Sequence, residues 1–501
     1  MVDAPAERLE SRPFAVESHG LDVIGESEHK GLPRSLFWPW FGSNAGLLGL
    51  SYGSFALGFG ISFWQALIAG VLGIVCSFLL CGFIAVGGKR GSAPTMVLSR
   101  AAYGVRGNRV PAAISWILNV GWETVLIAVA TTATATVFGR LGWGGGTGVK
   151  VAALIVVGAL TVAGGVMGFD MIMRLQTVIT VVTGVLTVVY MALVAGHIHW
   201  HTVSAVHSGS FQEFIGALVF MMTGFGLGWV NAAADYSRYL PRSTSNRSIV
   251  GWITFGASLA PILLLLFGLL LAGSSSSLSS AIAIDPVGAL TTILPTWFLL
   301  PFAVVAVLGM VGGAVLDIYS SGLALLAVGV RIPRYAAAGI DGVLMTVGAI
   351  YIVFFSSSFI GQFQGFLTTL GVPIAAWCGV ILADLALRRR GYDEHDLFRP
   401  RGRYGDVRVA PLVVTLGGTA LGWGLVTNTT AGWLDWQGYL LKPFGLGGRT
   451  GAWAYANLGV LTALVLAFAA TLFLFRNRIH AQEQQPYSEP APEGEVEVVE
   501  A

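Results

Sequence analysis

The sequence predicts an all-α polytopic membrane protein with twelve transmembrane helices. Of its 501 residues, 55% are hydrophobic and only 11% are charged, whereas a soluble domain carries about 25% charged residues. Apolar runs of roughly 20 residues, each long enough to cross the ~30 Å hydrocarbon core of a bilayer, recur along the chain. We expect spans at residues 36–60, 63–87, 110–138, 150–168, 172–196, 213–236, 249–273, 299–326, 337–356, 362–386, 409–428 and 453–475.

The basic residues predict the orientation of these spans. Those that follow even-numbered spans are Lys89, Arg90, Arg100, Arg106, Arg109, Arg174, Arg238, Arg242, Arg247, Arg331, Arg334, Arg388, Arg389, Arg390, Arg399, Arg401, Arg403, Arg476 and Arg478. The alternate loops carry only Arg140, Lys150, Lys442 and Arg449. Because Lys and Arg accumulate in cytoplasmic loops, we expect a multi-pass protein of the plasma membrane with both termini in the cytoplasm.

The spans divide the chain into five expected parts. Residues 1–35 form a polar cytoplasmic segment, 36–386 a core of helices 1–10, 387–408 a cytoplasmic loop, and 409–475 helices 11 and 12. The last part, 476–501, includes EQQPYSEPAPEGEVEVVEA, which is rich in Glu and Pro. Such a composition buries too little apolar surface to offset the entropy lost on ordering. We therefore expect a disordered acidic tail.

Two spans are rich in glycine near their centres. Span 1 reads WPWFGSNAGLLGLSYGSFALGFG, and span 6 contains TGFGLGW. Paired interruptions in corresponding apolar segments indicate a transporter of inverted repeats, with its site at the broken helices. The two spans are five apart, which fits a 5+5 inverted repeat followed by two extra helices. The alternative is that glycines such as Gly42 and Gly46 only allow close helix packing.

Polar and aromatic residues gather at the expected mid-depth of four spans. The midplane falls near 44–48 in span 1, 122–123 in span 3, Phe225 in span 6 and 312–313 in span 8. Polar or ionisable groups at this depth are costly and usually face a cavity or the interior of the bundle. Spans 1, 3, 6 and 8 are therefore expected to surround the functional site.

The chain resembles the nucleobase–cation symporter family, which holds purine–cytosine, cytosine and hydantoin permeases. The resemblance extends over about residues 36–400 and is carried by WFGSN, GSAPTMVLSRAAYGVRGNRVPA, the GW of span 3, AADYSRYLP, IYSSGL and FLTTLGVPIAAWCGVILAD. It implies a fold of the amino-acid-transporter (LeuT-like) type. In that fold a planar heterocycle lies between broken helices 1 and 6 and scaffold helices 3 and 8. Vitamin B6, allantoin and hydantoin carriers share these motifs. The motifs therefore identify the family but do not identify the substrate.

The resemblance also implies a sandwich of aromatic rings around the substrate. Trp122 corresponds to the stacking tryptophan of the family, and the second ring is either Phe225 or Trp229. On span 1, Asn44 can both donate and accept hydrogen bonds. The expected substrate-binding residues are Ser43, Asn44, Gly46, Trp122, Glu123, Phe225 and Trp229.

Four charged residues are candidates for coupling or gating. Glu123 can accept N–H groups of a substrate or take up a proton, but it points roughly 100° away from its neighbour Trp122. Asp317, about five residues inside the midplane of span 8, is a second proton carrier. Asp235 and Arg238 are three residues apart and are expected to pair on one helix face, as a structural or gating group at the cytoplasmic mouth.

The departures from the family pattern bear on the coupling ion. Many members carry Asn or Gln one turn after the tryptophan, where this chain has Leu126. Sodium-dependent members carry two hydroxyl residues on helix 8 where this chain has Gly312 and Gly313. Because a hard cation needs several oxygen ligands, protons are the expected coupling ion rather than sodium. No cofactor is expected, and no metal at HIHWH, 197–201, because acid and thiol ligands are missing nearby.

These observations predict a secondary active importer of a nucleobase such as cytosine or a purine, rather than an enzyme. Helices 1, 2, 6 and 7 would rock against a scaffold including helices 3, 4, 8 and 9. One alternative is a carrier of vitamin B6, allantoin, hydantoin or a hydroxymethylpyrimidine. The other is an integral membrane enzyme. The partners expected are the small heterocycle and membrane lipid, without nucleic acid; the oligomeric state stays open.

Overall fold

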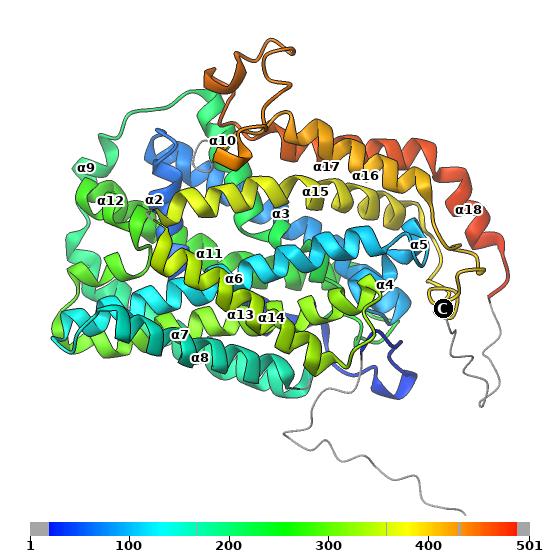
Figure 1. Cartoon of the computed structure of the whole chain (residues 1–501), viewed down its shortest axis with the longest axis horizontal. Helices are drawn as coiled ribbons and strands as arrows, with labels where there is room; N and C mark the ends of the chain where they lie inside the picture. The colour runs from blue at the N-terminus through cyan, green and yellow to red at the C-terminus, as the bar shows by residue number, and fades with distance from the viewer. Residues whose placement is uncertain (1–19, 168, 357, 429–431, 488–501) are drawn as a thin grey trace, which may run out of the picture.

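The computed structural model of the chain describes residues 20–167, 169–356, 358–428 and 432–487, and the regular elements in these ranges are helices (Figure 1). The α-helices are α1 Phe37–Asn44, α2 Leu48–Leu57, α3 Phe63–Gly91, α4 Thr95–Leu98, α5 Arg100–Tyr103, α6 Arg109–Arg140, α7 Thr147–Val166, α8 Phe169–Val194, α9 Trp200–Ser204, α10 Phe211–Gly224, α11 Asn246–Ser274, α12 Ser276–Ile284, α13 Leu299–Val328, α14 Arg334–Phe355, α15 Phe359–Leu387, α16 Val409–Trp423, α17 Leu458–Leu474 and α18 Arg476–Gln484. The 3-10 helices are η1 Glu26–Glu28, η2 Pro33–Leu36, η3 Ala195–His197, η4 Gly226–Gly228, η5 Val230–Ala232, η6 Gly288–Ile293, η7 Thr296–Phe298, η8 Gly432–Leu434 and η9 Gly448–Thr450.

The helices are consistent with the twelve expected spans. Within the described residues, nine helices are long and apolar enough to cross a membrane, and they correspond to spans 2–10. Span 1 is divided between α1 and α2. Spans 11 and 12 are shorter than expected, because α16 ends at Trp423 and α17 begins only at Leu458.

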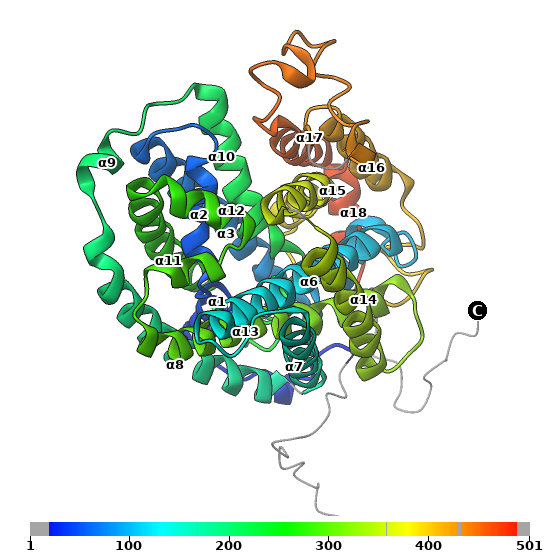
Figure 2. The same ribbon diagram turned by 60° about the vertical axis from the view of Figure 1, so that its left-hand side comes forward.

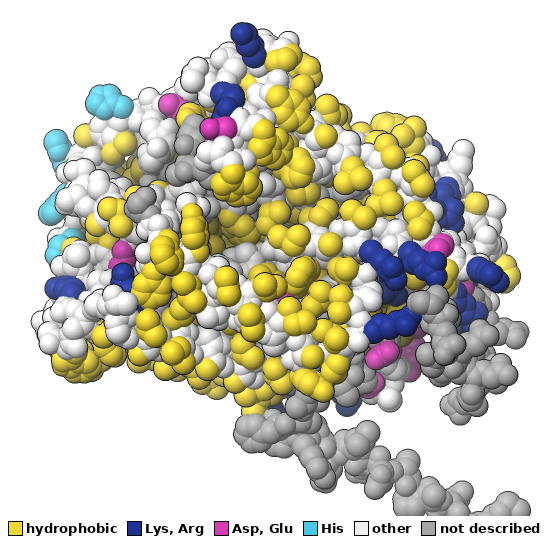
Figure 3. Space-filling view, viewed as in Figure 1, with side chains coloured by type: hydrophobic (Ala, Val, Ile, Leu, Met, Phe, Trp, Pro, Cys, Tyr) yellow, Lys and Arg dark blue, Asp and Glu magenta, His cyan; other side chains and the backbone are white. Residues whose placement is uncertain are grey.

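The outward faces of several spans are apolar. On α8, Val178, Val181, Val185 and Val188 are each more than half exposed, and their spacing of three or four residues places them on one face. Figure 3 shows a broad hydrophobic surface over the middle of the molecule and most of the Lys and Arg at one end. By contrast, 83% of the most apolar stretch of α15 is buried, against 33% for α14. The structure therefore has lipid-facing helices around more deeply buried ones.

Two groups of helices form the core of the bundle, and α15, α16 and α17 pack against one another beside them (Figure 2). In the first group, α11 packs against α1, α2 and α3, and α10 packs against α3. In the second, α6, α7, α13 and α14 pack against one another. Helix α8 contacts both α1 and α13. These groups are helices 1, 2, 6 and 7 and helices 3, 4, 8 and 9, the division that the family resemblance implies.

Spans 1 and 6 are both interrupted near the expected midplane. In span 1, α1 ends at Asn44 and α2 begins at Leu48. In span 6, α10 ends at Gly224, and Phe225 has the non-helical angles φ −125° and ψ −108° before η4 begins. The broken-helix interpretation is thus correct for these spans. Close packing occurs as well: a Cβ on Gly46 would lie 2.6 Å from Met310 Cε of α13.

The backbone groups freed by the break in span 6 have side-chain partners. The Tyr52 hydroxyl of α2 donates to the Gly224 carbonyl at 3.0 Å. The Gly226 N–H donates to Ser77 Oγ of α3 at 3.1 Å. Because lipid offers no hydrogen bonds, irregular backbone at this depth persists only where the protein supplies them. Spans 1 and 2 therefore hold the break in span 6 open.

At its inner end, span 6 is tied to the loop after span 2. Thr95, the first residue of α4, donates to Asp235 Oδ1 through its N–H at 2.8 Å and its hydroxyl at 2.7 Å. Asp235 and Arg238 do not form the expected direct ion pair, because Arg238 donates to the Tyr319 and Tyr239 hydroxyls at 3.0 Å each, but their charges still interact. The reason is that residues 233–239 form successive turns, so residues three apart no longer share one helix face.

The expectation of disorder from residue 476 onward needs a correction. Residues 476–484 form α18, which bends by 56° from α17. Gln482 Oε1 accepts from Arg388 Nη2 at 2.7 Å, and Glu483 Oε1 accepts from the backbone N–H groups of the two residues after Arg388. These hydrogen bonds to the loop that follows α15 order the segment despite its polarity. The expected disordered tail at 488–501 lies outside the described residues.

The bond across the break gives a first prediction. Tyr52→Phe should destabilise the protein by about 1–3 kcal/mol, because it leaves the buried Gly224 carbonyl without its partner while keeping the aromatic ring. Thermal unfolding of the detergent-purified protein measures the effect. Tyr455→Phe is the matched control, since Tyr455 is 52% exposed. Equal melting temperatures for the two variants would contradict a structural role for the Tyr52 hydroxyl.

A second prediction concerns the inner tie. Thr95→Val keeps the shape of the side chain but removes its hydrogen bond to the buried Asp235, so we expect a loss of about 1–3 kcal/mol in unfolding free energy. The same measurement applies, with the exposed Thr202→Val as control. If Thr95→Val unfolds at the same temperature as Thr202→Val, Asp235 does not stabilise this end of span 6 through Thr95.

Candidate functional site

A cavity of about 60 Å³ lies where the two broken spans meet α6 and α13. It brings together seven of the predicted residues: Ser43, Asn44, Gly46, Trp122, Phe225, Trp229 and Asp317. Leu126, Gly309 and Met310 line it as well. Glu123, Asp235 and Arg238 do not contribute to its lining.

Asn44 is the polar end of the α1 half-helix. Its Nδ2 donates to the Trp40 carbonyl at 2.9 Å and to Ser43 Oγ at 3.0 Å, so the end of the helix itself holds the amide in place. Within the described residues, no hydrogen bond involves the amide oxygen Oδ1. Asn44 can therefore present an acceptor to a molecule in the cavity.

Trp122 of α6 forms the opposite wall. Its ring contacts Phe363 and Phe366 edge-to-face, with centroids 5.6 and 5.7 Å apart. A Cβ on Gly228 would lie 2.8 Å from Trp122 Nε1, so only glycine fits there. The buried indole N–H has no partner among the described residues. The tryptophan is thus fixed from behind and keeps a donor near the cavity.

Both candidates for the second aromatic face line the cavity, and neighbouring rings hold each of them. Phe225 lies 4.4 Å from the Tyr52 ring, centroid to centroid. Trp229 contacts Trp40 at 5.8 Å with an interplanar angle of 78°. Because the α-helix ends at Gly224, Phe225 and Trp229 do not have the spacing of residues in a continuous helix. Both side chains can therefore line the same cavity. Phe225 and Trp229 therefore remain alternatives.

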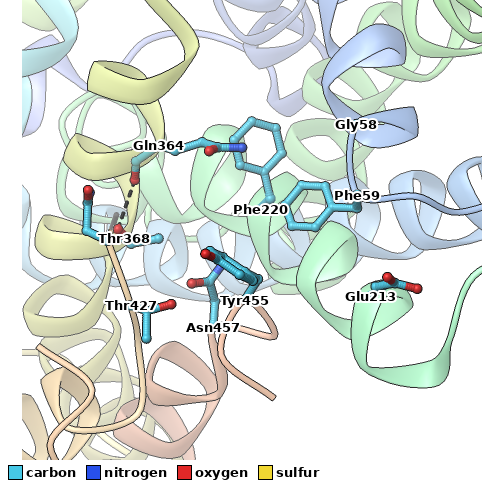
Figure 4. Close-up of a pocket in the computed structure, with 10 residues that line it drawn as sticks. Gly58, Phe59, Glu213, Phe220, Gln364, Thr368, Thr427, Tyr455 and Asn457 are labelled. Atoms are coloured by element: carbon cyan, nitrogen blue, oxygen red, sulfur yellow. Dashed lines mark hydrogen bonds between the residues drawn. The ribbon is translucent and has the colours of Figure 1, made fainter. Parts of the chain in front are cut away.

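The cavity is small, and aromatic rings separate it from a larger space nearby. Ligand pockets usually measure ~300–1,000 Å³, so the lining must move apart before a ring can enter. On the side that the sequence predicts to be outside lies a vestibule of about 310 Å³, where Phe59, Phe220 and Gln364 come together (Figure 4). Between the two spaces, Tyr52 and Phe363 contact Phe220 with ring centroids 5.6 and 6.2 Å apart. These aromatic rings form a closed layer.

The glycines of α13 face span 5 and the end of α1. Gln176 Nε2 of α8 donates to the Gly312 carbonyl at 2.7 Å. A Cβ on Gly313 would lie 3.6 Å from the Ser43 carbonyl. The place where sodium-dependent members carry hydroxyls thus has an amide donor instead. Sequence reasoning missed Gln176, although a polar residue inside an apolar span is a signal for function.

Glu123 lies behind the cavity wall, as its angle to Trp122 predicts. The side chain is fully buried, and neither carboxylate oxygen has a hydrogen-bond partner in the described parts of the chain. Asp317 and Asp341 are close enough to interact with it electrostatically. Asp341 of α14 was also missed, and the signal was the same: an ionisable residue inside a span.

The comparisons with known proteins agree with this architecture. A family model described as "permease for cytosine/purines, uracil, thiamine, allantoin" matches residues 23–440. The chain is 23% identical over 407 residues to the putative purine-cytosine permease YxlA of Bacillus subtilis, covering 78% of this chain and 84% of the relative. It is 26% identical over 470 residues to the purine-cytosine permease FCY2 of Saccharomyces cerevisiae, covering 86% and 82%.

Solved structures share the fold. Mhp1, a nucleobase-cation-symport-1 family transporter in a closed conformation with bromovinylhydantoin bound, superposes with a TM-score of 0.69 at 16% identity, over 94% of this chain and 97% of Mhp1. A Na⁺-coupled sialic acid symporter gives a TM-score of 0.57 at 10% identity, over 89% and 90%. The predicted LeuT-like fold is confirmed. Since the family model covers most of the chain and its members are permeases, this protein belongs to the nucleobase–cation symporter family and is a multi-pass membrane transporter, not an enzyme.

Proposed function

We propose that this transporter imports a planar nucleobase, such as cytosine or a purine, together with protons across the plasma membrane, with both termini in the cytoplasm. The observation that carries the proposal is the cavity at the two helix breaks. There the ring of Trp122 faces a space that Phe225, Trp229 and Asn44 also reach. Flat aromatic faces favour a flat ligand, and hydrogen-bonding groups at one edge select for heteroatoms on it.

The expected contacts follow from these side chains. The ligand ring would stack on Trp122 and on one of the two aromatic residues of span 6. The free Oδ1 of Asn44 would accept an N–H of the ligand edge, and the unpartnered Trp122 N–H is a possible donor. Binding then orders few groups, because the chain already holds both side chains in place.

Three features favour protons over sodium. Gly312 and Gly313 supply no side-chain oxygen, whereas a hard cation needs several oxygen ligands. Gln176 Nε2 already donates to the Gly312 carbonyl, which occupies one of the two lone pairs of this backbone oxygen. Asp317 lines the cavity, where a carboxylate can gain and lose a proton. A coupling ion must bind some conformations better than others, and a titrating carboxyl in this position meets that condition.

The two helix groups supply the movement. The group of α1, α2, α3, α10 and α11 would rock against α6, α7, α13 and α14, and so widen the cavity toward one side at a time. The aromatic layer of Tyr52, Phe220 and Phe363 would part on the outer side. The vestibule already reaches this layer, so opening it connects the cavity to the outside.

A second cargo class deserves the same test because of one substitution. Leu126 lines the cavity at a position where many family members carry an amide, so this site lacks one hydrogen-bonding group for a base. The description of the family includes thiamine and allantoin, and Mhp1 was solved with a hydantoin. A vitamin B6 vitamer, allantoin, a hydantoin or a hydroxymethylpyrimidine is therefore the alternative cargo.

The third prediction is uptake into proteoliposomes under separately imposed gradients. Labelled cytosine, adenine, hypoxanthine, uracil, allantoin and pyridoxine are offered in turn. We expect one nucleobase to accumulate, unmodified, when the outside is acidic, and a sodium gradient at constant pH to have no effect. Accumulation driven by sodium alone would overturn the coupling, and transport restricted to allantoin or pyridoxine would overturn the cargo.

The fourth prediction identifies the aromatic sandwich. Stacking on an aromatic side chain is worth about 1–3 kcal/mol per base, which corresponds to a loss of roughly 5–150-fold in affinity. We expect that loss for Trp122→Ala and for only one of Phe225→Ala and Trp229→Ala, with partial recovery in Trp122→Phe. The measurement is the dissociation constant of the transported base, with Trp433→Ala as control because Trp433 is 74% exposed. Unchanged affinity in Trp122→Ala would rule out the sandwich.

A further inference from the structure

We propose that Glu123, Asp317 and Asp341 form one proton-binding unit, in which Asp341 shares a proton with Glu123 and Asp317 connects the pair to the cavity. The inference rests on the proposed proton coupling and deepens it, because it adds a residue of α14 that the family resemblance does not supply. Two observations support it: the three carboxyls lie on helices that pack together, and the hydrogen-bond partners of Asp341 differ from those of Glu123.

Three mutually packed helices bring the carboxyls together. Helix α6 packs against α13 and α14, and these two also contact each other. Measured along its own helix from the predicted cytoplasmic end, Glu123 lies roughly 21 Å deep, Asp317 roughly 16 Å and Asp341 roughly 10 Å. All three side chains are at least 98% buried. The unit therefore extends from mid-depth toward the cytoplasm, with Asp317 at the wall of the cavity.

The environment of Asp341 suits a negative charge. Trp116 Nε1 donates to Asp341 Oδ1 at 2.6 Å, and Ser321 Oγ donates to Oδ2 at 2.7 Å. Both oxygens act as acceptors, and donors to a carboxylate favour its charged form. Asp341 is thus the member of the unit best prepared to carry the charge.

The environment of Glu123 suits a proton. Neither carboxylate oxygen has a described partner with hydrogen-bond geometry, since the nearby Ser321 hydroxyl donates to Asp341 instead, and the side chain has no exposed surface. A buried ionised carboxylate without partners is far more costly than a neutral carboxyl. In the resting state, the proton therefore resides on Glu123 and the negative charge on Asp341.

Among the described residues, no Lys or Arg forms an ion pair with any of the three acids. The charged side chains of the helices packed against α6 are Asp317 on α13, Arg334 and Asp341 on α14, Lys150 on α7 and Asp384 on α15. Arg334 donates to the Gly165 carbonyl at 2.8 Å and lies over the Tyr319 ring. Lys150 lies at the opposite end of its helix, and Asp384 pairs with Arg388. Two ionised carboxylates at this place would repel each other strongly, so the unit retains a proton and titrates as a whole.

The proton transfer within the unit conserves charge. The Glu123 carboxyl gives its proton to the Ser321 hydroxyl, which passes its own proton to Asp341 Oδ2, so that Glu123 is left ionised and Asp341 neutral. The proton moves toward the cytoplasmic end of the bundle, and Asp317 can then deliver the next proton from the cavity to Glu123. Because Trp122 is the neighbour of Glu123 on α6, a shift of this helix on ligand binding would change the surroundings of both sites at once.

The first arm of the test needs no substrate. Infrared difference spectra of the purified protein, recorded in pH steps, follow the C=O stretching band of a protonated carboxyl. We expect such a band at neutral pH, its loss in Glu123→Gln, and its disappearance at a lower pH in Asp341→Asn, because that variant removes a negative neighbour. Asp435→Asn is the matched control, since Asp435 pairs with Arg449 on the surface. A band that is absent from the wild type, or a midpoint unchanged in Asp341→Asn, overturns the proposal.

A second variant allows the proposal to be tested even if the first variant does not fold. If Asp341→Asn does not fold, Ser321→Ala keeps all three carboxyls and removes one donor to Asp341. The band midpoint should then shift relative to that of the wild type, because the proton is divided differently. An unchanged midpoint in Ser321→Ala overturns the proposal in that case.

The second arm separates this inference from the proposed function. In proteoliposomes loaded with unlabelled cytosine, we expect Asp341→Asn to exchange labelled cytosine within about 3-fold of the wild-type rate. The same variant should lose at least about 90% of the accumulation driven by a pH gradient. Full pH-driven accumulation in Asp341→Asn overturns the proton unit and leaves the proposed function intact. Wild-type uptake that ignores the pH gradient overturns the proposed coupling, and the infrared arm still decides whether the three acids share a proton.

Discussion

A helix that ends in the middle of a bilayer leaves backbone N–H and C=O groups that lipid cannot hydrogen-bond. This fold depends on the side chains that bond to such groups at the break in span 6. The Gly224 carbonyl accepts from Tyr52, and the Gly226 N–H donates to Ser77. These partners belong to spans 1 and 2, so the break in span 6 exists only while those spans lie beside it. The same bonds join three helices of one group into a unit. The cavity then lies at the boundary between that unit and the group of α6 and α13, where relative motion changes its size.

Two neighbouring residues of α6 serve two proposed functions on different faces of the helix, one in substrate binding and one in proton binding. Trp122 faces the cavity, and Glu123, the next residue, faces α13 and α14. A substrate on the first face and a proton on the second never compete for space, yet both act on the same rigid helix. Coupling between two ligands requires that each binds one conformation better than another. The shared helix offers a direct way for the proposed substrate and proton to favour the same conformation.

Much of this arrangement could be predicted from the sequence because the bilayer imposes simple rules. Apolar length gave the spans, and glycine content gave the two breaks, which lie at the expected depth. The interactions that depend on tertiary contacts were harder. Asp235 and Arg238 share a helix face only if the helix continues, and here it unwinds into turns. The order of α18 depends on Arg388, nearly a hundred residues earlier. Asp341 and Gln176 stood in apolar spans as visible signals, but their partners on other helices are a property of the folded chain.

The low identity to structures of the same fold has a physical explanation that also locates the specificity. Lipid-facing positions need only apolar side chains, and helices satisfy their own backbone, so most residues of such a bundle can change without loss of the fold. Few positions at mid-depth carry the chemistry. This chain keeps the tryptophan of helix 3 but has Leu126 one turn later, and it has Gly312 and Gly313 where sodium-dependent members carry hydroxyls. The Gly312 carbonyl of α13 accepts from the Gln176 amide, and α6, α13 and α14 each carry a buried carboxyl, namely Glu123, Asp317 and Asp341. Glycines without a side-chain oxygen at 312 and 313, together with buried acids that can hold a proton, are the combination that supports the proposed proton coupling.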